Sequence, residues 1–234
     1  MRRVAVIPAR GGSKRLPRKN VLPFWGRPML AWTVDAALDT GLFQRVVVST
    51  EDAEIAETAR IAGAEVAARD PELAGDGARV TEVCLDFLCR EEEAGCSYDV
   101  LCVLYATTPL RTAEDIRGVV DLVEPGQWDF ALAVTHYDLP PHQALRRGPA
   151  GGLEPMWPEM VTARAEEVGE LLVDNGSTYA ASVTAFRENG EFYGPGLRGH
   201  VMPRSRSVDL DDAEDWELLE FYAARRGLGK GPGS

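Results

Sequence analysis

A chain of 234 residues that is 45% hydrophobic can form one large α/β domain, or one domain with a small appendage, around a substantial core. The net charge of −12 excludes a general nucleic-acid-binding protein, because such a protein needs a basic face. No stretch approaches the roughly 18 unbroken apolar residues of a membrane span, and the first apolar run is only strand-length, which argues against a signal peptide. We therefore expect a cytoplasmic location, with neither nucleic acid nor membrane as a partner.

Apolar runs of strand length alternate with helical stretches along most of the chain. The expected strands cover residues 4–7, 45–49, 64–67, 99–104, 128–134, 177–183 and a short one near 200–203. The expected helices cover residues 28–41, 51–62, 81–94, 113–123 and about 212–226. Strands and helices alternate strictly as far as residue 134, which predicts an α/β fold with a mainly parallel sheet and helices on both faces.

One segment interrupts this alternation. Residues 139–175 contain five prolines, several glycines and few helical runs. We expect a protruding arm or lid there, inserted into a core made of residues 1–138 and 176–228. The glycine-rich end of the chain, residues 229–234, is expected to be disordered.

A polar, glycine-containing loop at residues 9–20 follows the first expected strand directly. In open α/β sheets, ligands bind beyond the carboxyl ends of the strands. Gly11 and Gly12 allow backbone N–H groups to approach an anion closely. Positive charge suited to a polyphosphate comes from Arg10, Lys14, Arg18 and Lys19. The spacing matches neither Walker A nor GxGxxG, and the alternative is a solvated basic turn.

Four further segments of the sequence contribute to the same family resemblance as the loop. They are Arg45-Val-Val-Val-Ser-Thr50 with Asp52, residues 69–78, residues 107–111 and residues 207–216. Together with the loop, they resemble the CMP-acylneuraminate synthetase family, the cytidylyltransferases that activate sialic, legionaminic, pseudaminic and related acidic sugars. The resemblance runs from residue 2 to about residue 222. It implies a Rossmann-like nucleotidyltransferase fold and a homodimer in which the irregular arm reaches into the partner subunit.

The resemblance also implies roles for individual residues. The phosphates of CTP are expected against the loop, and cytosine against Arg69 and the backbone near Ala78. Mg²⁺ is expected at Asp209 and Asp211. The implied nucleotide-binding residues are Ala9, Arg10, Gly11, Gly12, Ser13, Lys19, Asn20, Arg69 and Ala78. The implied catalytic residues are Arg10, Lys19, Asp209 and Asp211.

The late pair of carboxylates also suits a metal by its own chemistry. Asp209 and Asp211 alternate with Leu210, so both carboxylates face one side of an extended chain. Two hard oxygen ligands, completed by phosphate oxygens, suit octahedral Mg²⁺. The alternative is that this segment only caps the last helix, although Asp212 can take that role while the other two bind metal.

The implied reaction is nucleotidyl transfer. An acceptor oxygen attacks the α-phosphorus of CTP in line, and pyrophosphate leaves. Mg²⁺ and the basic loop neutralise the charge that grows on the bridging and leaving oxygens.

The acceptor side departs from the family's usual pattern. Tyr105-Ala-Thr-Thr-Pro109 and Gln143 differ from the sialic acid enzymes and look more like the pseudaminic acid branch. That branch's Arg-Ser-Gln segment is here Arg164-Ala-Glu166, which adds a negative charge. The expected acceptor-binding residues are Tyr105, Arg111, His142, Gln143, Arg164 and Tyr179.

Two acceptors remain open at this point. One is a nonulosonic acid of pseudaminic or sialic type, for which Tyr179, Phe192 and Tyr193 form either an apolar wall for an acyl group or ordinary core aromatics. The other is a small phosphonate such as phosphonoformate, as in an actinobacterial natural-product pathway. A compact dianion of that kind would be held by Arg111, His142, Arg146 and Arg164.

Two other classes of protein share part of the pattern. A non-catalytic nucleotide-binding protein would keep the loop but could lose Asp209 or Asp211, and both are present. A glycosyltransferase of similar fold typically places its Asp-x-Asp after a central strand, whereas here that motif lies near the end of the chain. A cytidylyltransferase releases pyrophosphate from CTP when an acid acceptor is present, whereas a non-catalytic nucleotide-binding protein and a glycosyltransferase do not.

Overall fold

The structure is a computed structural model that describes residues 1–13, 15–75 and 77–227. Lys14, which the sequence assigns to a polyphosphate site, lies outside the described residues, as does the tail at 229–234. Within the described ranges, no helix is both long and apolar enough to cross a membrane.

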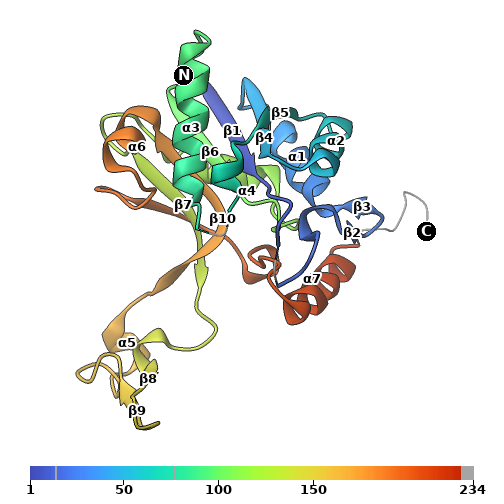
Figure 1. Ribbon diagram of the computed structural model, residues 1–234. Helices are drawn as coiled ribbons and strands as arrows, with labels where there is room; N and C mark the ends of the chain where they lie inside the picture. Colours follow the sequence, from blue (N-terminus) through green and yellow to red (C-terminus); the bar gives the residue numbers. More distant parts are fainter. Residues whose placement is uncertain (14, 76, 228–234) are drawn as a thin grey trace.

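Seven strands of the described chain form a single sheet in the order β11-β7-β10-β6-β1-β4-β5 (Figure 1). They are β1 (Arg3–Pro8), β4 (Arg45–Thr50), β5 (Glu65–Ala68), β6 (Val100–Leu104), β7 (Phe130–His136), β10 (Leu172–Ser182) and β11 (Arg198–Val201). Neighbouring strands are parallel except around β10, which runs antiparallel to both β6 and β7. The expected α/β fold with a mainly parallel sheet is therefore confirmed.

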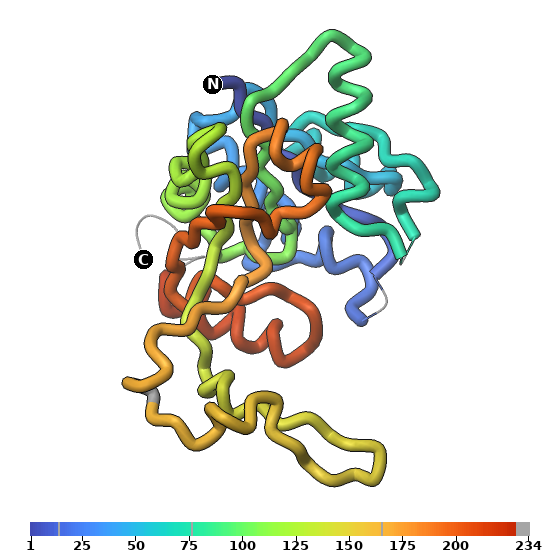
Figure 2. The backbone as a smooth tube through the Cα atoms, turned by 90° about the vertical axis from the view of Figure 1, so that its left-hand side faces the viewer, coloured from blue at the N-terminus to red at the C-terminus, as the bar shows by residue number. Residues whose placement is uncertain are grey.

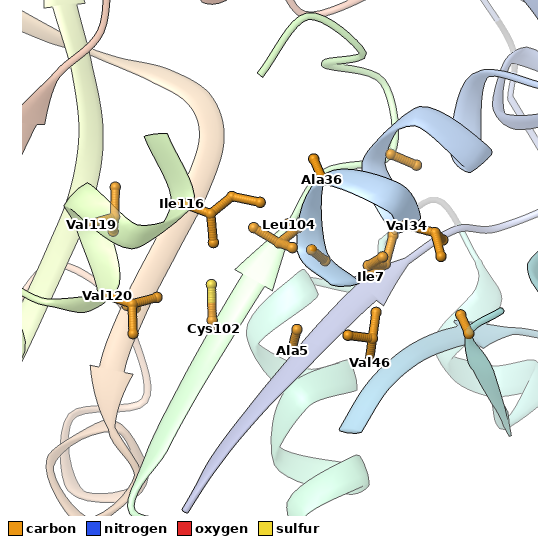
Figure 3. Close-up of a cluster of buried hydrophobic side chains, with 14 of the residues drawn as sticks. Ala5, Ile7, Val34, Ala36, Val46, Cys102, Leu104, Ile116, Val119 and Val120 are labelled. Atoms are coloured by element: carbon orange, nitrogen blue, oxygen red, sulfur yellow. The ribbon is translucent and has the colours of Figure 1, made fainter. Parts of the chain in front are cut away.

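Helices cover both faces of this sheet. One face carries α1 (Met29–Asp39), α2 (Ala53–Ile61) and α4 (Ala113–Val120), and the other carries α3 (Val80–Glu93) and α6 (Val183–Asn189). In β1, Ala5 and Ile7 belong to the apolar cluster under α1 and α4 (Figure 3), whereas Val4 and Val6 pack under α3. The continuous apolar run is thus buried on both sides, as expected of a central parallel strand.

The last helix, α7 (Ala213–Arg225), packs against the small hairpin of β2 (Pro23–Phe24) and β3 (Arg27–Pro28). Asp212 begins this helix, because its side chain accepts hydrogen bonds from the amides of the first turn. The amide of Leu210, just before the helix, donates to the carbonyl of Thr107 at 3.0 Å. These contacts hold the segment before α7 at the end of β6.

The chain between β7 and β10 projects away from the sheet (Figures 1 and 2). It carries the hairpin of β8 (Leu145–Arg147) and β9 (Leu153–Pro155) and the short α5 (Ala165–Val168). We expected irregular chain up to residue 175, but β10 already begins at Leu172, which pairs with His136 of β7. Gly176 interrupts the apolar pattern and looks like a strand boundary, although the strand continues through it with a shift of register.

Helix α6 is a second difference from expectation. We expected a strand up to residue 183, but the helix begins at Val183, and Ser182 caps it by accepting the amide of Ala185 at 3.3 Å. Gly190, with φ of +72°, ends it in the left-handed conformation. Seven residues make about two turns, too few for the 3.6-residue period to stand out in the sequence.

Candidate active site

A cavity of about 660 Å³ lies beyond the carboxyl ends of β1 and β6, where open α/β sheets bind their ligands. The loop after β1, the turn after β6 and the segment before α7 all contribute to its wall. The predicted site residues that line it are Arg10, Ser13, Lys19, Asn20, Arg69, Ala78, Tyr105, Asp209 and Asp211. Three predicted nucleotide-binding residues of the loop, Ala9, Gly11 and Gly12, do not line it. Residues 10 and 211, near opposite ends of the chain, therefore border one cavity.

The loop after β1 is held in shape by close contacts. Asn20 Nδ2 donates to the carbonyl of Arg10 at 3.0 Å, which closes the loop. Gly11 lies so near Asp52 that an added Cβ would stand 2.6 Å from Asp52 Oδ2. Only glycine therefore fits at this position without a shift of its neighbour.

Carboxylates around the start of α2 already bind part of the loop. Glu51 Oε1 accepts the Gly11 amide at 2.7 Å. Arg18 pairs with Asp52 at 2.6 Å and also with Glu54, and its hydrogen bond lowers the pKa of Asp52. Arg18 is not among the residues that line the cavity. The ion pairs of Arg18 therefore hold the loop against the start of α2.

Two cations of the loop reach the segment before α7. Lys19 Nζ lies 3.0 Å from Asp211 Oδ1 and donates to the carbonyl of Leu210 at 2.8 Å. Arg15 Nη2 lies 2.9 Å from Asp211 Oδ2. The sequence interpretation did not assign Arg15 to the site, although its place in the basic loop was an available signal. Because both ion pairs are partly exposed, a phosphate or a metal ion can exchange with them.

Asp209 has a more enclosed environment than Asp211. Thr107 Oγ1 donates to Asp209 Oδ1. Burial raises the pKa of the Asp209 carboxyl, while the Thr107 hydrogen bond and the charge of Lys19 oppose that shift. A carboxylate in such surroundings is stabilised by a nearby cation.

The chemistry of Asp209 and Asp211 fits Mg²⁺. Both residues line the same cavity and present hard carboxylate oxygens. The part of the chain that the structure describes holds no group of three or more side chains of the metal-binding types. Mg²⁺ needs only one or two carboxylates when phosphate and water complete its shell. The residues present therefore fit a metal ion that binds together with a nucleotide.

The residues expected to bind cytosine line the same cavity. Arg69 follows β5 and is only 8% exposed, and its Nη2 donates to the carbonyl of Ser49 at 2.7 Å. Burial lowers the pKa of Arg69 from its high ordinary value. Ala78 lies in the turn before α3 and borders the cavity together with Gly75.

A second cavity, of about 180 Å³, adjoins the first, since Tyr105 and Val80 line both. Tyr179 packs edge-on against Tyr105 with ring centroids 5.7 Å apart, and its ring lies 5.5 Å from that of Phe192. Phe192 is 5% exposed, whereas Tyr193 is 58% exposed. The aromatic residues left open by the sequence thus form both core and cavity wall.

Four of the predicted acceptor residues line neither of these two cavities. Arg111 is 3% exposed, and its guanidinium donates to oxygen atoms of α1, β10 and the turn after β6. Burial lowers the pKa of Arg111 to about 10. It supports the wall of the site from behind. The projecting segment carries His142, Gln143 and Arg164.

The fold and the first cavity are those of a nucleotidyltransferase: a mainly parallel sheet whose first loop presents cations to two late carboxylates. A sequence model described as cytidylyltransferase matches residues 4–139. The chain belongs to the cytidylyltransferase family. The resemblance drawn from the sequence is confirmed.

Two relatives are similar to this chain over almost their whole length. The pseudaminic acid cytidylyltransferase of Campylobacter jejuni is 31% identical over 222 residues, covering 94% of this chain and 96% of the relative. The CMP-N,N'-diacetyllegionaminic acid synthase of Legionella pneumophila is 33% identical over 227 residues, covering 94% and 95%. A solved CMP:2-keto-3-deoxy-manno-octonic acid synthetase complexed with CTP has a TM-score of 0.72 at 17% identity, over 97% of this chain and 100% of that chain. That likeness shows the shared fold.

Proposed function

We propose that the protein transfers CMP from CTP to a nonulosonic acid of pseudaminic or sialic type, with release of pyrophosphate. The observation that carries this proposal is the meeting of Lys19 and Arg15 with Asp211, beside Asp209, in one cavity. A triphosphate needs cations and Mg²⁺ needs carboxylates, and the cavity supplies both. The relatives named for pseudaminic and diacetyllegionaminic acids support this acceptor class.

In this proposal the first cavity holds CTP. Arg10 and Lys19 contact the phosphates, while Arg69 and the backbone near Ala78 contact cytosine. The loop binds the triphosphate by charge and by backbone amides, so it needs little rearrangement beyond the release of its carboxylate partners.

Asp209 and Asp211 would hold Mg²⁺ in the same cavity. When bound, the ion neutralises charge on the phosphate oxygens and favours attack at phosphorus. In the free protein Asp211 orients Lys19 and Arg15 toward the cavity, so the cations are in place before the nucleotide arrives.

The acceptor occupies the second cavity in this proposal. Tyr105 borders both cavities, so a molecule in the second one reaches the nucleotide in the first. The aromatic wall of Tyr179 and Phe192 suits an acyl substituent. An acceptor hydroxyl attacks the α-phosphorus, and the new P–O bond forms as the bond to pyrophosphate breaks.

The small-phosphonate alternative has less support. It depends on four basic residues that gather round a compact dianion, namely Arg111, His142, Arg146 and Arg164. Arg111 is buried behind the turn after β6, and the other three belong to the projecting segment. We therefore keep a phosphonate only as an outcome of the screen below.

We further propose that the protein is a homodimer and that the projecting segment takes part in the interface. Leu139 is 79% and Leu153 59% exposed on that segment. Exposed apolar side chains on a projecting segment favour an interface. The cytoplasmic location remains a prediction of the sequence.

The test is a pyrophosphate-release assay with CTP, Mg²⁺ and a panel of acids. The panel holds pseudaminic, legionaminic and sialic acids, 2-keto-3-deoxy-manno-octonic acid and phosphonoformate. We expect release with a nonulosonic acid, with CTP preferred over ATP, GTP and UTP, and loss of release when a chelator removes Mg²⁺. Release with phosphonoformate alone supports the alternative, and release with none of the acids contradicts the proposed function.

A further inference from the structure

One carboxylate behind the second cavity binds both of that cavity's outer phenols. The Tyr179 hydroxyl donates to Asp174 Oδ2 at 2.8 Å, and the Tyr193 hydroxyl donates to the same oxygen at 2.5 Å. The other oxygen, Oδ1, accepts the Gly176 amide at 2.9 Å. Both tyrosines line the cavity, whereas Asp174 does not. The carboxylate therefore acts on the cavity through the two phenols.

A bulge in β10 makes this contact possible. Asp174 and Tyr179 are five residues apart, a spacing that puts side chains on opposite faces of a regular strand. The pairing of β10 with β7 shifts register between these two residues, and Gly176 between them has φ of +69°. The bulge changes which face of the sheet the following side chains point to, so the side chains of Asp174 and Tyr179 lie on the same face and make contact.

These hydrogen bonds determine what the cavity wall offers to a ligand. A phenol has one proton to donate, and Asp174 accepts the proton of both Tyr179 and Tyr193. Toward a ligand, each phenol oxygen can then act only as an acceptor. Burial, and after it the Asp174 carboxylate, raise the pKa of both phenols, so both stay protonated at neutral pH.

The remaining polar residues in the lining of the second cavity are Thr81, Tyr105, Arg79 and Glu191. Thr81 lines the cavity, and its buried Oγ1 has no hydrogen-bond partner among the described residues. A buried hydroxyl without a partner is costly, so a ligand atom suits it. Among the described lining residues the only cation is Arg79, and it pairs with Glu191 at 2.8 Å.

The size of the cavity fits a substituent of the acceptor. At about 180 Å³ the cavity lies below the roughly 300 to 1,000 Å³ of pockets that hold a whole drug-sized molecule. An acylamido group carries an N–H donor beside an apolar acyl carbon. The donor matches the phenol oxygens, and the acyl carbon matches the ring of Phe192.

We propose that Asp174 is a positioning residue that determines acceptor specificity. By accepting the protons of Tyr179 and Tyr193, it turns both phenols into hydrogen-bond acceptors. The second cavity therefore selects an acid whose entering substituent carries an amide N–H donor beside an apolar acyl carbon. This inference rests on the proposed function, because it requires the second cavity to hold the acceptor.

The first test compares Asp174→Ala and Asp174→Asn with the unmodified protein in the pyrophosphate assay. With the acylamido acid that the unmodified protein uses best, we expect Asp174→Ala to raise the KM for the acid about tenfold, the effect of a lost hydrogen-bond arrangement. The KM for CTP and kcat should stay within about twofold. Asp174→Asn keeps an acceptor oxygen in place and should restore part of the loss.

The second test measures selectivity. The ratio of kcat/KM for the acylamido acid to that for 2-keto-3-deoxy-manno-octonic acid, which has no amide, should fall about tenfold in Asp174→Ala. Tyr193→Phe should lower the same ratio by a smaller factor. Because Tyr193 is largely exposed, this variant remains informative if Asp174→Ala does not fold.

Glu91→Gln provides the matched control. Glu91 Oε2 also accepts a phenol proton, from Tyr98 at 2.7 Å, but Tyr98 lies before β6 at the opposite end of that strand from Tyr105. This variant should leave the selectivity ratio unchanged.

The outcomes separate the inference from the proposed function. An unchanged KM for the acid and an unchanged ratio in a folded Asp174→Ala or Tyr193→Phe variant overturn the inference alone. An equal rise in the KM values for CTP and the acid shows a general structural role and also overturns it. If the unmodified protein releases no pyrophosphate with any acid, the proposed function fails and the inference fails with it.

Discussion

The two adjoining cavities are built from different chemistry. The first joins cations and carboxylates from the two ends of the chain, with Lys19 and Arg15 both paired to Asp211. Half of the residues that line the second are aromatic, and its polar atoms include two phenols held by Asp174 and the hydroxyl of Thr81, which has no partner in the described part of the chain. The cavities share the ring of Tyr105, so the contrast exists within one continuous site.

This contrast shows how one site can treat two substrates differently. Recognition by charge tolerates an exchange of partners, so phosphate oxygens or Mg²⁺ can replace the carboxylates that pair with the loop cations in the free protein. Recognition by hydrogen bonds depends on which atom carries the proton. The first cavity should therefore be sensitive to a loss of charge, and the second to a loss of hydrogen-bond direction.

The largest expected effect is the removal of a carboxylate from the first cavity. Asp209→Asn and Asp211→Asn keep the size of the side chain but remove the charge that suits Mg²⁺. We expect each to lower kcat about 10²- to 10³-fold in the pyrophosphate assay, as for the loss of one electrostatic contact to the transition state.

Asp212→Asn is the control for these variants. Asp212 caps α7 and does not line the first cavity, so its change should cost about 1 kcal/mol of stability or less and leave kcat in place. Undiminished turnover of both Asp209→Asn and Asp211→Asn would show that the late carboxylates play no part in the reaction.

A smaller effect is expected from crowding the loop. In Gly11→Ala the new Cβ would stand 2.6 Å from Asp52 Oδ2, so the loop or the start of α2 must shift. Such overpacking costs about 1–3 kcal/mol, and we expect the KM for CTP to rise about tenfold with little change in the KM for the acid. Gly152→Ala, where an added Cβ meets nothing within 4 Å, is the control. Equal KM values for CTP in both variants would contradict this account of the loop.

The smallest expected effect is on the pH dependence of stability. Burial, and then Asp174, raise the pKa of Tyr179 and Tyr193 in the folded protein, so the folded state binds their protons more tightly than the unfolded chain does. This contribution to stability is complete below about pH 10, the ordinary value for tyrosine, and is lost as the pH rises above it.

Urea unfolding at a series of pH values from neutral to alkaline measures this contribution. The free energy of unfolding should fall more steeply at alkaline pH in the unmodified protein than in Asp174→Asn. Identical slopes would show that Asp174 does not hold the phenol protons in solution.

The first cavity was largely predictable from the sequence. A glycine-containing basic loop directly after a buried strand favours a ligand site over a solvated turn in an open α/β sheet, because ligands bind at the carboxyl ends of its strands. The contacts within the loop were not predictable. Arg18 turns to Asp52, while Arg15 turns to Asp211, and only the folded chain shows which cation borders the cavity.

The second cavity was only partly predictable. Tyr179 was expected to bind the acceptor. Asp174 was assigned to the irregular arm, because the expected strand began only after Gly176, whereas β10 continues through that glycine with a shift of register. Arg111 illustrates the opposite problem. A sequence does not distinguish an arginine that faces a ligand from one that is buried against main-chain oxygens, as this one is.

The central claim is that the cavity between the loop and the late carboxylates holds the triphosphate of CTP. A crystal structure of the protein with CTP and Mg²⁺ tests it most directly. The account predicts the phosphates against Arg10 and Lys19, the metal ion on Asp209 and Asp211, and the base beside Arg69. Nucleotide bound elsewhere, with this cavity filled by solvent, would contradict the account.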